Sequence, residues 1–264
     1  MLLAIDIGNS NITLGGIQEG EILFEARLAT DATKTSDEYG VEIKDMLDLF
    51  GARVEEIRDC IVASVVPPVF NSVRNGIVKL TGKEPMVVGP GIKTGINILL
   101  EDPGATGAAL IAAAVAAVDA YPTPLTVVDM GTATTIAVID DGNAFLGGAV
   151  LPGLRISAEA LSSRASLLPG IQLERPRRAI GKNTVECMQS GLMFGAAAMV
   201  DGLIDRMEAE LGRPTTVVAT GGVARFVVPL CRHEIALERD LQLKGLDLLY
   251  RKNRPRKEAA PDPR

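Results

Sequence analysis

The stretch DMGTATTIAVID, residues 129–140, decides how this chain folds, because it places a carboxylate, a glycine and several hydroxyl side chains at the end of an apolar strand. A near-copy, AIDIGNSNITL, occupies residues 4–14, where Asp6 ends an apolar run and Gly8 follows two residues later. The two aspartates are 129 − 6 = 123 positions apart, about half of the 264 residues. The same offset carries Gly8 onto Gly131, Asn9 onto Thr132 and Asn11 onto Thr134. This repeat predicts a duplication in which two similar halves face each other.

The residue types of the two stretches are typical of phosphate binding. A glycine lets the turn adopt positive φ and brings backbone N–H groups close to an anion, while Ser, Thr and Asn side chains donate further hydrogen bonds. The two aspartates would repel a phosphate, so this interpretation requires a cation held by their carboxylates. The alternative for either stretch alone is an ordinary β-hairpin with polar turn residues. Two copies half a chain apart favour the phosphate interpretation.

Composition excludes several classes of protein. With 47% hydrophobic residues the chain is globular, and its length allows one large domain or two of ordinary size. A net charge of −6, 3% aromatic residues and no tryptophan argue against nucleic-acid partners. The three cysteines are widely spaced, so the sequence predicts neither a disulfide framework nor a zinc site and favours a reducing cytoplasm. We expect no signal peptide and no membrane anchor, because the longest apolar segment, residues 108–118, is too short to span a bilayer.

Hydrophobic periodicity predicts the same order of elements twice. In the first half we expect strands at 2–7, 11–17 and 21–28, a helix capped by Ser36 and ended by Gly51, a strand at 60–66, a helix at 71–80 and a strand at 86–88. A glycine-rich loop, 89–104, leads to an alanine-rich helix at 107–120 that is apolar on every face. Such a helix is buried between elements or between subunits. The chain is therefore predicted to be an α/β protein with two βββαβα halves.

The second half repeats the pattern with longer helices. We expect strands at 125–129, 133–140 and 144–150, helices at 155–166 and 184–211, strands at 215–219 and 234–237, and a last helix ending at 250. The strand at 215–219 leads into Thr220, Gly221 and Gly222, a turn suited to packing against a flat ligand such as adenosine. The charged, proline-containing tail from Arg251 to the end is predicted to be disordered.

Few side chains offer other chemistry. His233 is the only histidine, which excludes a histidine-based triad and an HExxH metal site, and we interpret it as a surface residue. Thr184 follows Lys182 and Asn183 at the start of a predicted helix. For this segment helix capping and ligand contact remain equally open.

Together these motifs resemble the actin, sugar-kinase and heat-shock-chaperone superfamily and, in detail, the type III pantothenate kinase family. The resemblance covers residues 1 to about 250 and rests on DIGNSNIT, ASVVP, DMGTATT, GGAVLPG, IGKNT and TGG, which stand in the family's order. It implies duplicated ribonuclease-H-like βββαβα halves with an ATP cleft between them. The implied division is an N-terminal half at 1–105, a linking helix and C-terminal half at 106–250, and a tail at 251–264.

The resemblance also implies a set of site residues. The ATP-binding residues would be Asp6, Ile7, Gly8, Asn9, Ser10, Asn11, Ile12, Thr13, Thr132, Gly221 and Gly222. Asp6 would hold Mg²⁺, Asp129 a monovalent cation, K⁺ or NH₄⁺, and Thr184 would contact pantothenate. Family members are homodimers with substrate sites near the subunit interface, so a homodimer is expected.

The substrate loop departs from the family pattern, PxExGADR. Here the corresponding residues 103–110 read PGATGAAL, and the substrate-binding stretch is Gly107, Ala108, Ala109 and Leu110. The family glutamate is replaced by Ala105, the aspartate that serves as general base by Ala109, and the arginine by Leu110. Two functions therefore stay open. One is ATP-dependent phosphorylation of pantothenate, the first step of coenzyme A biosynthesis, slowed or using another carboxylate such as Glu101 or Asp102. The other is a catalytically silent nucleotide-binding relative that acts as a regulatory or partner subunit.

Overall fold

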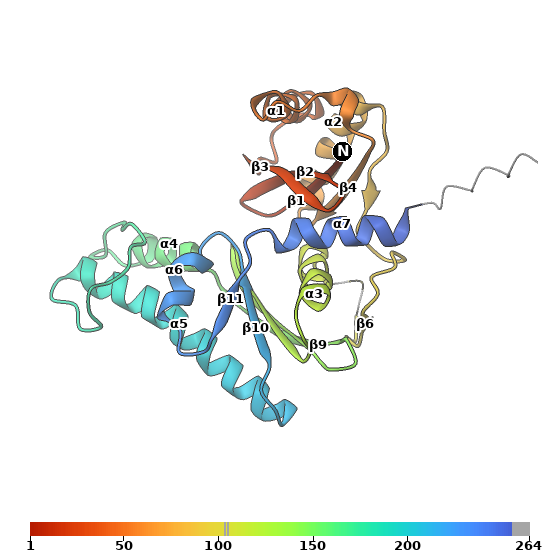
Figure 1. The fold of residues 1–264 in the computed structure, drawn as a ribbon. Coiled ribbons are helices and arrows are strands. Elements are labelled where there is room, and N and C mark those ends of the chain that lie inside the picture. The colour runs from red at the N-terminus through yellow and green to blue at the C-terminus, as the bar shows by residue number, and fades with distance from the viewer. Residues whose placement is uncertain (103, 105, 255–264) are drawn as a thin grey trace, which may run out of the picture.

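The chain forms two β-sheets of matching topology, as Figure 1 shows for the computed structural model, which describes residues 1–102, 104 and 106–254. The first sheet has the order β3-β2-β1-β4-β5, with β1 (Leu2–Ile7), β2 (Asn11–Gln18), β3 (Glu21–Ala29), β4 (Asp59–Ser64) and β5 (Met86–Val87). The second has the order β11-β10-β7-β8-β9-β6, with β6 (Asn97–Ile98), β7 (Leu125–Met130), β8 (Ala133–Ile139), β9 (Ala144–Pro152), β10 (Thr216–Thr220) and β11 (Ile235–Leu237).

The two sheets correspond strand by strand. In each half the first three strands are antiparallel neighbours, and the fourth pairs in parallel with the first. The predicted duplicated α/β fold is therefore confirmed. The exception is β6, a two-residue strand that adds to the edge of the second sheet beside β9. It lies in the segment predicted as a glycine-rich loop, and two residues are too few to give a period in the sequence.

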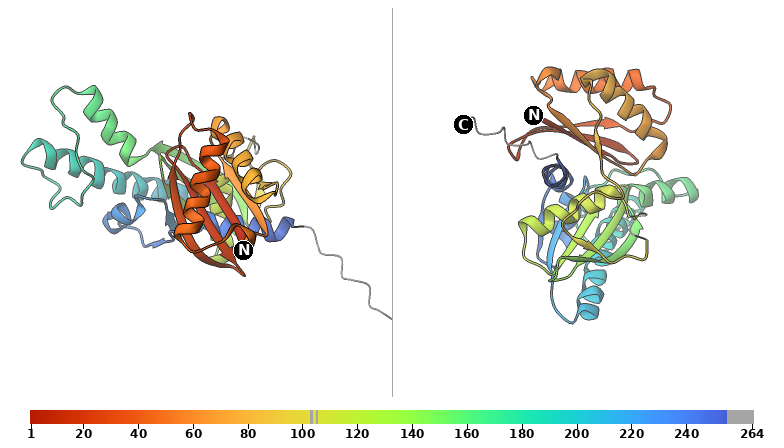
Figure 2. Two further views of the ribbon diagram at one scale, coloured as in Figure 1. Left: turned by 90° about the horizontal axis from the view of Figure 1, so that it is seen from above. Right: turned by 90° about the vertical axis from the view of Figure 1, so that its right-hand side faces the viewer.

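Helices cover the outer faces of the sheets and fill the space between them (Figures 1 and 2). The long helices are α1 (Ser36–Leu49), α2 (Pro67–Thr81), α3 (Ala108–Ala120), α4 (Leu154–Arg164), α5 (Thr184–Leu211) and α7 (Leu241–Asn253), and α6 (Ala224–Val227) is a single turn. Short 3₁₀ turns lie at Val54–Glu56 and Val228–Leu230. Helices α1 and α2 lie on the outer side of the first sheet, α4 and α5 on the outer side of the second, and α3 and α7 between the sheets.

The alternation of side chains along β1 and β7 determines what faces the centre of the molecule. Leu3, Ile5 and Ile7 belong to the outer core with α1 and α2, whereas Leu2 and Ala4 belong to the core between the sheets. Strand β7 repeats this division, with Leu125 and Val127 in the central core and Val128 and Met130 in the outer core under α5. Because residues i, i+2 and i+4 share one face of a strand, the aspartate that ends each series belongs to the central face.

Helix α3 is apolar on every face because it lies in the central core against α7. Its residues 111–117 are all buried. A Cβ atom added at Gly245 of α7 would lie 1.9 Å from the carbonyl oxygen of Ala112, so the two helix backbones approach closely and glycine is required. Burial between elements thus accounts for the composition of this helix.

Helix α5 is the one helix in the described ranges that is long and apolar enough to cross a membrane, judged by length and composition alone. Core helices of globular proteins pass the same test. Its buried side chains include Leu192, Met193, Ala197, Val200 and Ile204, which pack in the core under the second sheet. We therefore interpret α5 as a core helix.

Several predicted boundaries need correction. The cap of α1 is Thr35 rather than Ser36, because the Thr35 hydroxyl accepts from the Glu38 amide while the Glu38 carboxylate accepts from the Thr35 amide. Helix α2 begins at Pro67, since proline is tolerated in a helix's first turn. Helix α7 continues to Asn253, so the predicted disorder is wrong for 251–253. The rest of that predicted tail, from residue 255 onward, lies outside the described residues.

The repeated turns differ in length by one residue. Asp6 pairs with Thr13 across the first turn, a separation of 13 − 6 = 7, and Asp129 pairs with Thr135 across the second, a separation of 135 − 129 = 6. The Gly8 amide donates to the Asn11 carbonyl, and the Gly131 amide donates to the Ala133 carbonyl. Asn11 therefore corresponds to Ala133, and its predicted match to Thr134 is wrong.

Candidate nucleotide and metal site

The structure brings the two polar turns together where β1 and β7 end. The Ser10 hydroxyl lies 2.8 Å from the Thr132 hydroxyl, across 122 positions of sequence. Asp6 and Asp129, on the central faces of their strands, are close enough for each other's charge to matter, because repulsion from Asp129 raises the pKa of Asp6. The two turns predicted from the sequence thus meet at a single polar site.

The two aspartates are poorly solvated as carboxylates. Burial, with the added repulsion from Asp129, raises the pKa of Asp6 to about 7. Burial also raises the pKa of Asp129 to about 6, and the hydrogen bond from Gln242 opposes that rise. Oδ1 of Asp6 is enclosed and has no hydrogen-bond partner among the described residues. An enclosed oxygen without a donor, facing a second carboxylate, is a good ligand for a cation.

The carboxylate oxygens of this site suit a metal ion whose other ligands are phosphate oxygens and water. Within residues 1–102, 104 and 106–254, no group of three or more His, Cys, Asp or Glu side chains could enclose a metal ion. Mg²⁺ in phosphoryl-transfer sites typically takes one or two carboxylates and fills its remaining positions with phosphate oxygens and water. Asp6 therefore fits a magnesium ion that arrives with a phosphate ligand, and Asp129 is a second carboxylate beside it that could hold a further cation.

Gln242, at the start of α7, completes the site and was missed by sequence analysis. Its Nε2 donates to Oδ2 of Asp129 at 3.0 Å, and its Oε1 accepts from the Thr220 hydroxyl at 3.3 Å. Gln242 therefore fixes the orientation of Asp129 relative to the glycine turn. It lies 113 positions from Asp129 in an ordinary amphipathic helix, so no local sequence signal could identify it.

The acid pair predicts a pH dependence for the metal-free protein. A carboxyl group whose pKa is higher in the folded than in the unfolded state binds more protons when folded, so its contribution to stability is present below about pH 4 and is lost as the pH rises to about 7. In EDTA, the free energy of unfolding should fall between pH 5 and pH 8 in wild type and fall less in Asp6→Asn. The two falls should differ by on the order of 3 kcal/mol.

Chemical denaturation at both pH values measures this difference. Asp45→Asn, on the exposed face of α1, is the matched control and should follow wild type. The same pH dependence in Asp6→Asn and wild type would contradict the prediction.

The glycine turn after β10 lies directly beside the second polar turn. Thr220 pairs with Asp129, and the next residue, Gly221, has φ of +98°. A Cβ atom at Gly221 would lie 2.5–2.7 Å from backbone atoms of Met130, whereas one at Gly222 would first meet Arg27 Nη1 at 3.7 Å. Gly221 is therefore required by the close approach of β10 to β7, whereas Gly222 has room for a Cβ atom.

This contrast predicts different costs for two neighbouring substitutions. We expect Gly221→Ala to lower the free energy of unfolding by about 2–4 kcal/mol, because it combines backbone strain with overlap against a backbone that cannot move. Gly222→Ala should change it by less than about 0.5 kcal/mol. Urea denaturation of the two variants tests this directly, and equal stabilities would show that the turn relaxes.

Comparison with known proteins agrees with this geometry. The sequence profile of the family described as type III pantothenate kinase matches residues 2–206. The chain belongs to this family. Together with the duplicated fold, membership of this family supports an ATP-dependent kinase of the actin and sugar-kinase type.

Solved structures show the same fold at low identity. One is described as a conserved putative Baf family transcriptional activator from Campylobacter jejuni, with a TM-score of 0.60, 18% identity, and coverage of 95% of this chain and 98% of that one. A second is component A of (R)-2-hydroxyglutaryl-CoA dehydratase from Acidaminococcus fermentans, with a TM-score of 0.55, 18% identity, and coverage of 93% of this chain and 94% of that one. A third is the ROK hexokinase from Thermus thermophilus, with a TM-score of 0.52, 14% identity, and coverage of 94% of this chain and 97% of that one.

The stretch aligned with the family's substrate loop lies beside the end of β1. Gly107 caps α3, and Ala108, Ala109 and Leu110 form its half-buried first turn. A Cβ atom at Gly107 would lie 3.4 Å from Val65, whose amide donates to the Ile7 carbonyl. Positions 103 and 105 of this loop, including the alanine at the family glutamate position, lie outside the described residues.

Thr184 lies at the exposed start of α5, where the capping interpretation is confirmed for its neighbour. The Asn183 side chain accepts from the Glu186 amide at 2.9 Å, and the Lys182 amide donates to the Glu186 carboxylate at 3.0 Å. Contact of Thr184 with a ligand stays a prediction. His233 is half-buried rather than a free surface residue, because its Nε2 lies 2.8 Å from Oδ1 of Asp205.

A small apolar pocket of about 180 Å³ opens beside the second polar turn. Met130 and Thr134 from the turn, Val223 after the glycine pair, and Leu192 and Met199 from α5 contribute to its lining. Met130 belongs to the outer core beneath α5, so this pocket lies on the opposite face of β7 from Asp129.

Proposed function

We propose that this chain transfers the terminal phosphoryl group of ATP to pantothenate, the first step of coenzyme A biosynthesis. The observation that carries the proposal is the pair of matching turns, which bring Asp6 and Asp129 together in a chain of the type III pantothenate kinase family. In this proposal Asp6 holds Mg²⁺, Asp129 a monovalent cation, K⁺ or NH₄⁺, and Thr184 contacts pantothenate. The protein would act in the cytoplasm.

The proposed chemistry depends mainly on positioning. The hydroxyls of Ser10 and Thr132 would donate to phosphate oxygens, while the turn at Gly221 and Gly222 would support the adenosine. A bound magnesium ion would supply the charge that offsets the phosphates. Phosphoryl transfer makes small covalent demands on the protein, so a chain without the usual base retains most of the required parts.

The acceptor side supports a second candidate, a nucleotide-binding relative that acts through a partner. Ala109 and Leu110 stand where the family has the general base and an arginine that orients the substrate. Loss of a positioned base typically costs about 10²–10⁴-fold in rate. The remaining nearby carboxylates, Glu101 and Asp102, are exposed.

One pair of measurements separates the two candidates. Calorimetry with Mg-ATP measures nucleotide binding, and a coupled assay of ADP release in the presence and absence of pantothenate measures transfer. Binding with pantothenate-dependent ADP release supports the kinase, and binding without it supports the silent relative. Absence of Mg-ATP binding would overturn both.

We also propose that the chain is a homodimer, as the resemblance implied. Exposed apolar side chains on β9 and α4 support this: Val150 is 77% exposed, and Ile156 and Leu161 are also exposed. Sedimentation at micromolar concentration tests this, and a Val150→Asp variant should shift the protein toward monomer. A wild-type chain that sediments as a monomer would contradict the proposal.

A further inference from the structure

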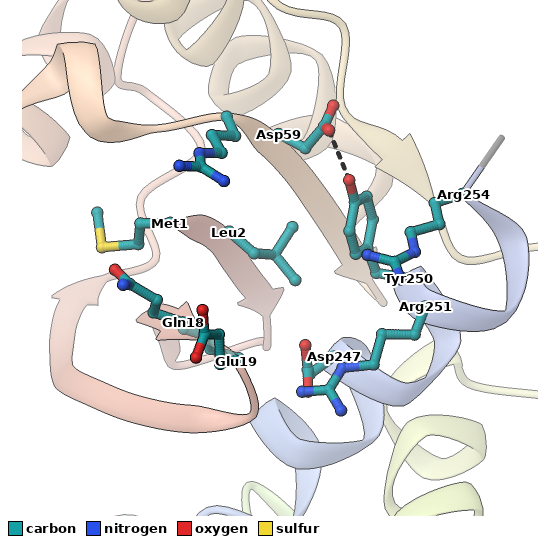
Figure 3. Close-up of a pocket in the computed structure, with 11 residues that line it drawn as sticks. Met1, Leu2, Gln18, Glu19, Asp59, Asp247, Tyr250, Arg251 and Arg254 are labelled. Carbon is teal, nitrogen blue, oxygen red and sulfur yellow. Dashed lines mark hydrogen bonds and ion pairs between the residues drawn. The ribbon is translucent and has the colours of Figure 1, made fainter. Parts of the chain in front are cut away.

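A second pocket, of about 240 Å³, lies at the opposite ends of the elements that form the nucleotide cleft. Its lining comes from the start of β1, the turn between β2 and β3, the start of β4 and the last turns of α7. Figure 3 shows Leu2 at the base, Glu19 on the turn, and Tyr250, Arg251 and Arg254 projecting from α7 and the residue after it.

The acidic groups of this pocket are largely engaged. Tyr250 donates its hydroxyl to Asp59 at 2.5 Å, the bond drawn in Figure 3. Arg251 pairs with Asp247, four residues earlier on α7, at 2.5 Å. Arg251 also fits tightly against the turn, because a Cβ atom at Gly20 would lie 2.6 Å from its Nη2. These contacts hold the pocket wall in place.

Two arginines of the pocket have no such partner. Arg58 and Arg254 make no ion pair within 4 Å in the described part of the chain, and Glu19 is the one lining carboxylate that neither Tyr250 nor Arg251 engages. Leu2 and Ile17 lie beneath these charges, and both side chains are buried. Two guanidinium groups that form no ion pair match a small ligand with a negatively charged group.

The pocket is smaller than the roughly 300–1,000 Å³ of pockets that enclose drug-sized molecules, so a small metabolite fits it and a nucleotide does not. Its walls connect it to the nucleotide cleft. Strand β1 begins with Leu2 in the pocket and ends near Asp6, and α7 begins with Gln242 on Asp129 and ends with Tyr250 in the pocket. Helix α7 is also held rigidly against α3 at Gly245.

We propose that this pocket is a second ligand site, for a small organic anion, and that α7 couples it to the nucleotide site. The coupling rests on the proposed nucleotide function, whereas binding to the pocket does not. A ligand that draws Arg254 and Arg58 together shifts the end of α7, and the same rigid helix carries Gln242, which orients Asp129.

The first experiment measures binding of phenyl phosphate and of benzoate to the full chain by calorimetry without nucleotide. Benzyl alcohol is the uncharged control. We expect saturable binding of at least one anion, about tenfold weaker binding in Arg58→Gln and in Arg254→Gln, and tighter binding in Glu19→Gln. Arg213→Gln, which removes the same charge from an exposed pair in the second half, should bind like wild type.

The outcomes are distinct. Absence of binding by both anions, or equal binding of benzyl alcohol, overturns the site. Binding that is unchanged in both arginine variants would place the probe elsewhere, such as at the phosphate turns, and also overturns it. Circular dichroism confirms that the variants are folded.

The second experiment measures the affinity for Mg-ATP with and without the saturating probe. Coupling requires a change of at least about threefold, and by reciprocity Mg-ATP must change the probe's affinity by the same factor. An unchanged ATP affinity overturns the coupling. If Mg-ATP does not bind at all, the proposed function fails, while the probe titration still decides whether the pocket is a site.

Discussion

Replacing Asp6 with asparagine will weaken Mg-ATP binding by about 10–100-fold, or ~1.5–3 kcal/mol, and lower any phosphoryl transfer by about 10³-fold. The side chain keeps its shape and loses its charge, so the cation that offsets the phosphates loses a ligand. Oδ1 of Asp6 is buried, and no described residue donates a hydrogen bond to it. A cation would therefore stabilise this oxygen. Calorimetry with and without magnesium, together with an ADP-release assay, measures both effects.

The same substitution will make the metal-free protein more stable at neutral pH. Asp6 and Asp129 repel each other, and burial raises the pKa of both. An amide in place of one carboxylate removes this repulsion without leaving a cavity. A substitution that weakens ligand binding but raises stability identifies a side chain that serves binding rather than the stability of the fold. Equal ATP affinity in wild type and Asp6→Asn, with magnesium present, would show that Asp6 does not hold the cation.

Restoring the family residues in the acceptor stretch will raise pantothenate phosphorylation by about 10²–10⁴-fold in the double variant Ala109→Asp with Leu110→Arg. Wild-type transfer is expected to be weak. Both positions are half-buried in the first turn of α3, so the new charges are not enclosed in the core. An aspartate near the start of a helix is also stabilised by about 0.3–1 kcal/mol.

The structure identifies the main cost of this design. Leu110 packs against the central core, so arginine there gives up apolar contact. We expect a loss of about 1 kcal/mol in stability, which denaturation measures separately from activity. The pair Ala109→Asn with Leu110→Gln introduces polar side chains without the charges and should gain no activity. Robust transfer by the wild type would show that another residue supplies the base, and Asp102→Asn would be the first variant to test.

The duplicated fold could be predicted from the sequence because the signals for it are local and occur in both halves. Each half carries its own period-2 strands and its own acid-glycine turn, so the strand order followed without knowledge of the partner half. The exact start of α5 at Thr184 and the first strand, Leu2–Ile7, were predicted to the residue. Thr35 was missed as a cap because Ser36 is an equally good capping residue next to it.

The tertiary structure alone decided how the two halves combine into one site. Alternation along β1 and β7 places both aspartates on the central faces, but only the packing of α3 and α7 between the sheets brings those faces together. Gln242 reaches Asp129 because α7 returns from the second half to the first, and Gly221 is required because β10 approaches Met130. Such contacts join residues about a hundred positions apart. Their energies depend on distances that no local period encodes, so the sequence could name the two turns but not the glutamine that joins them.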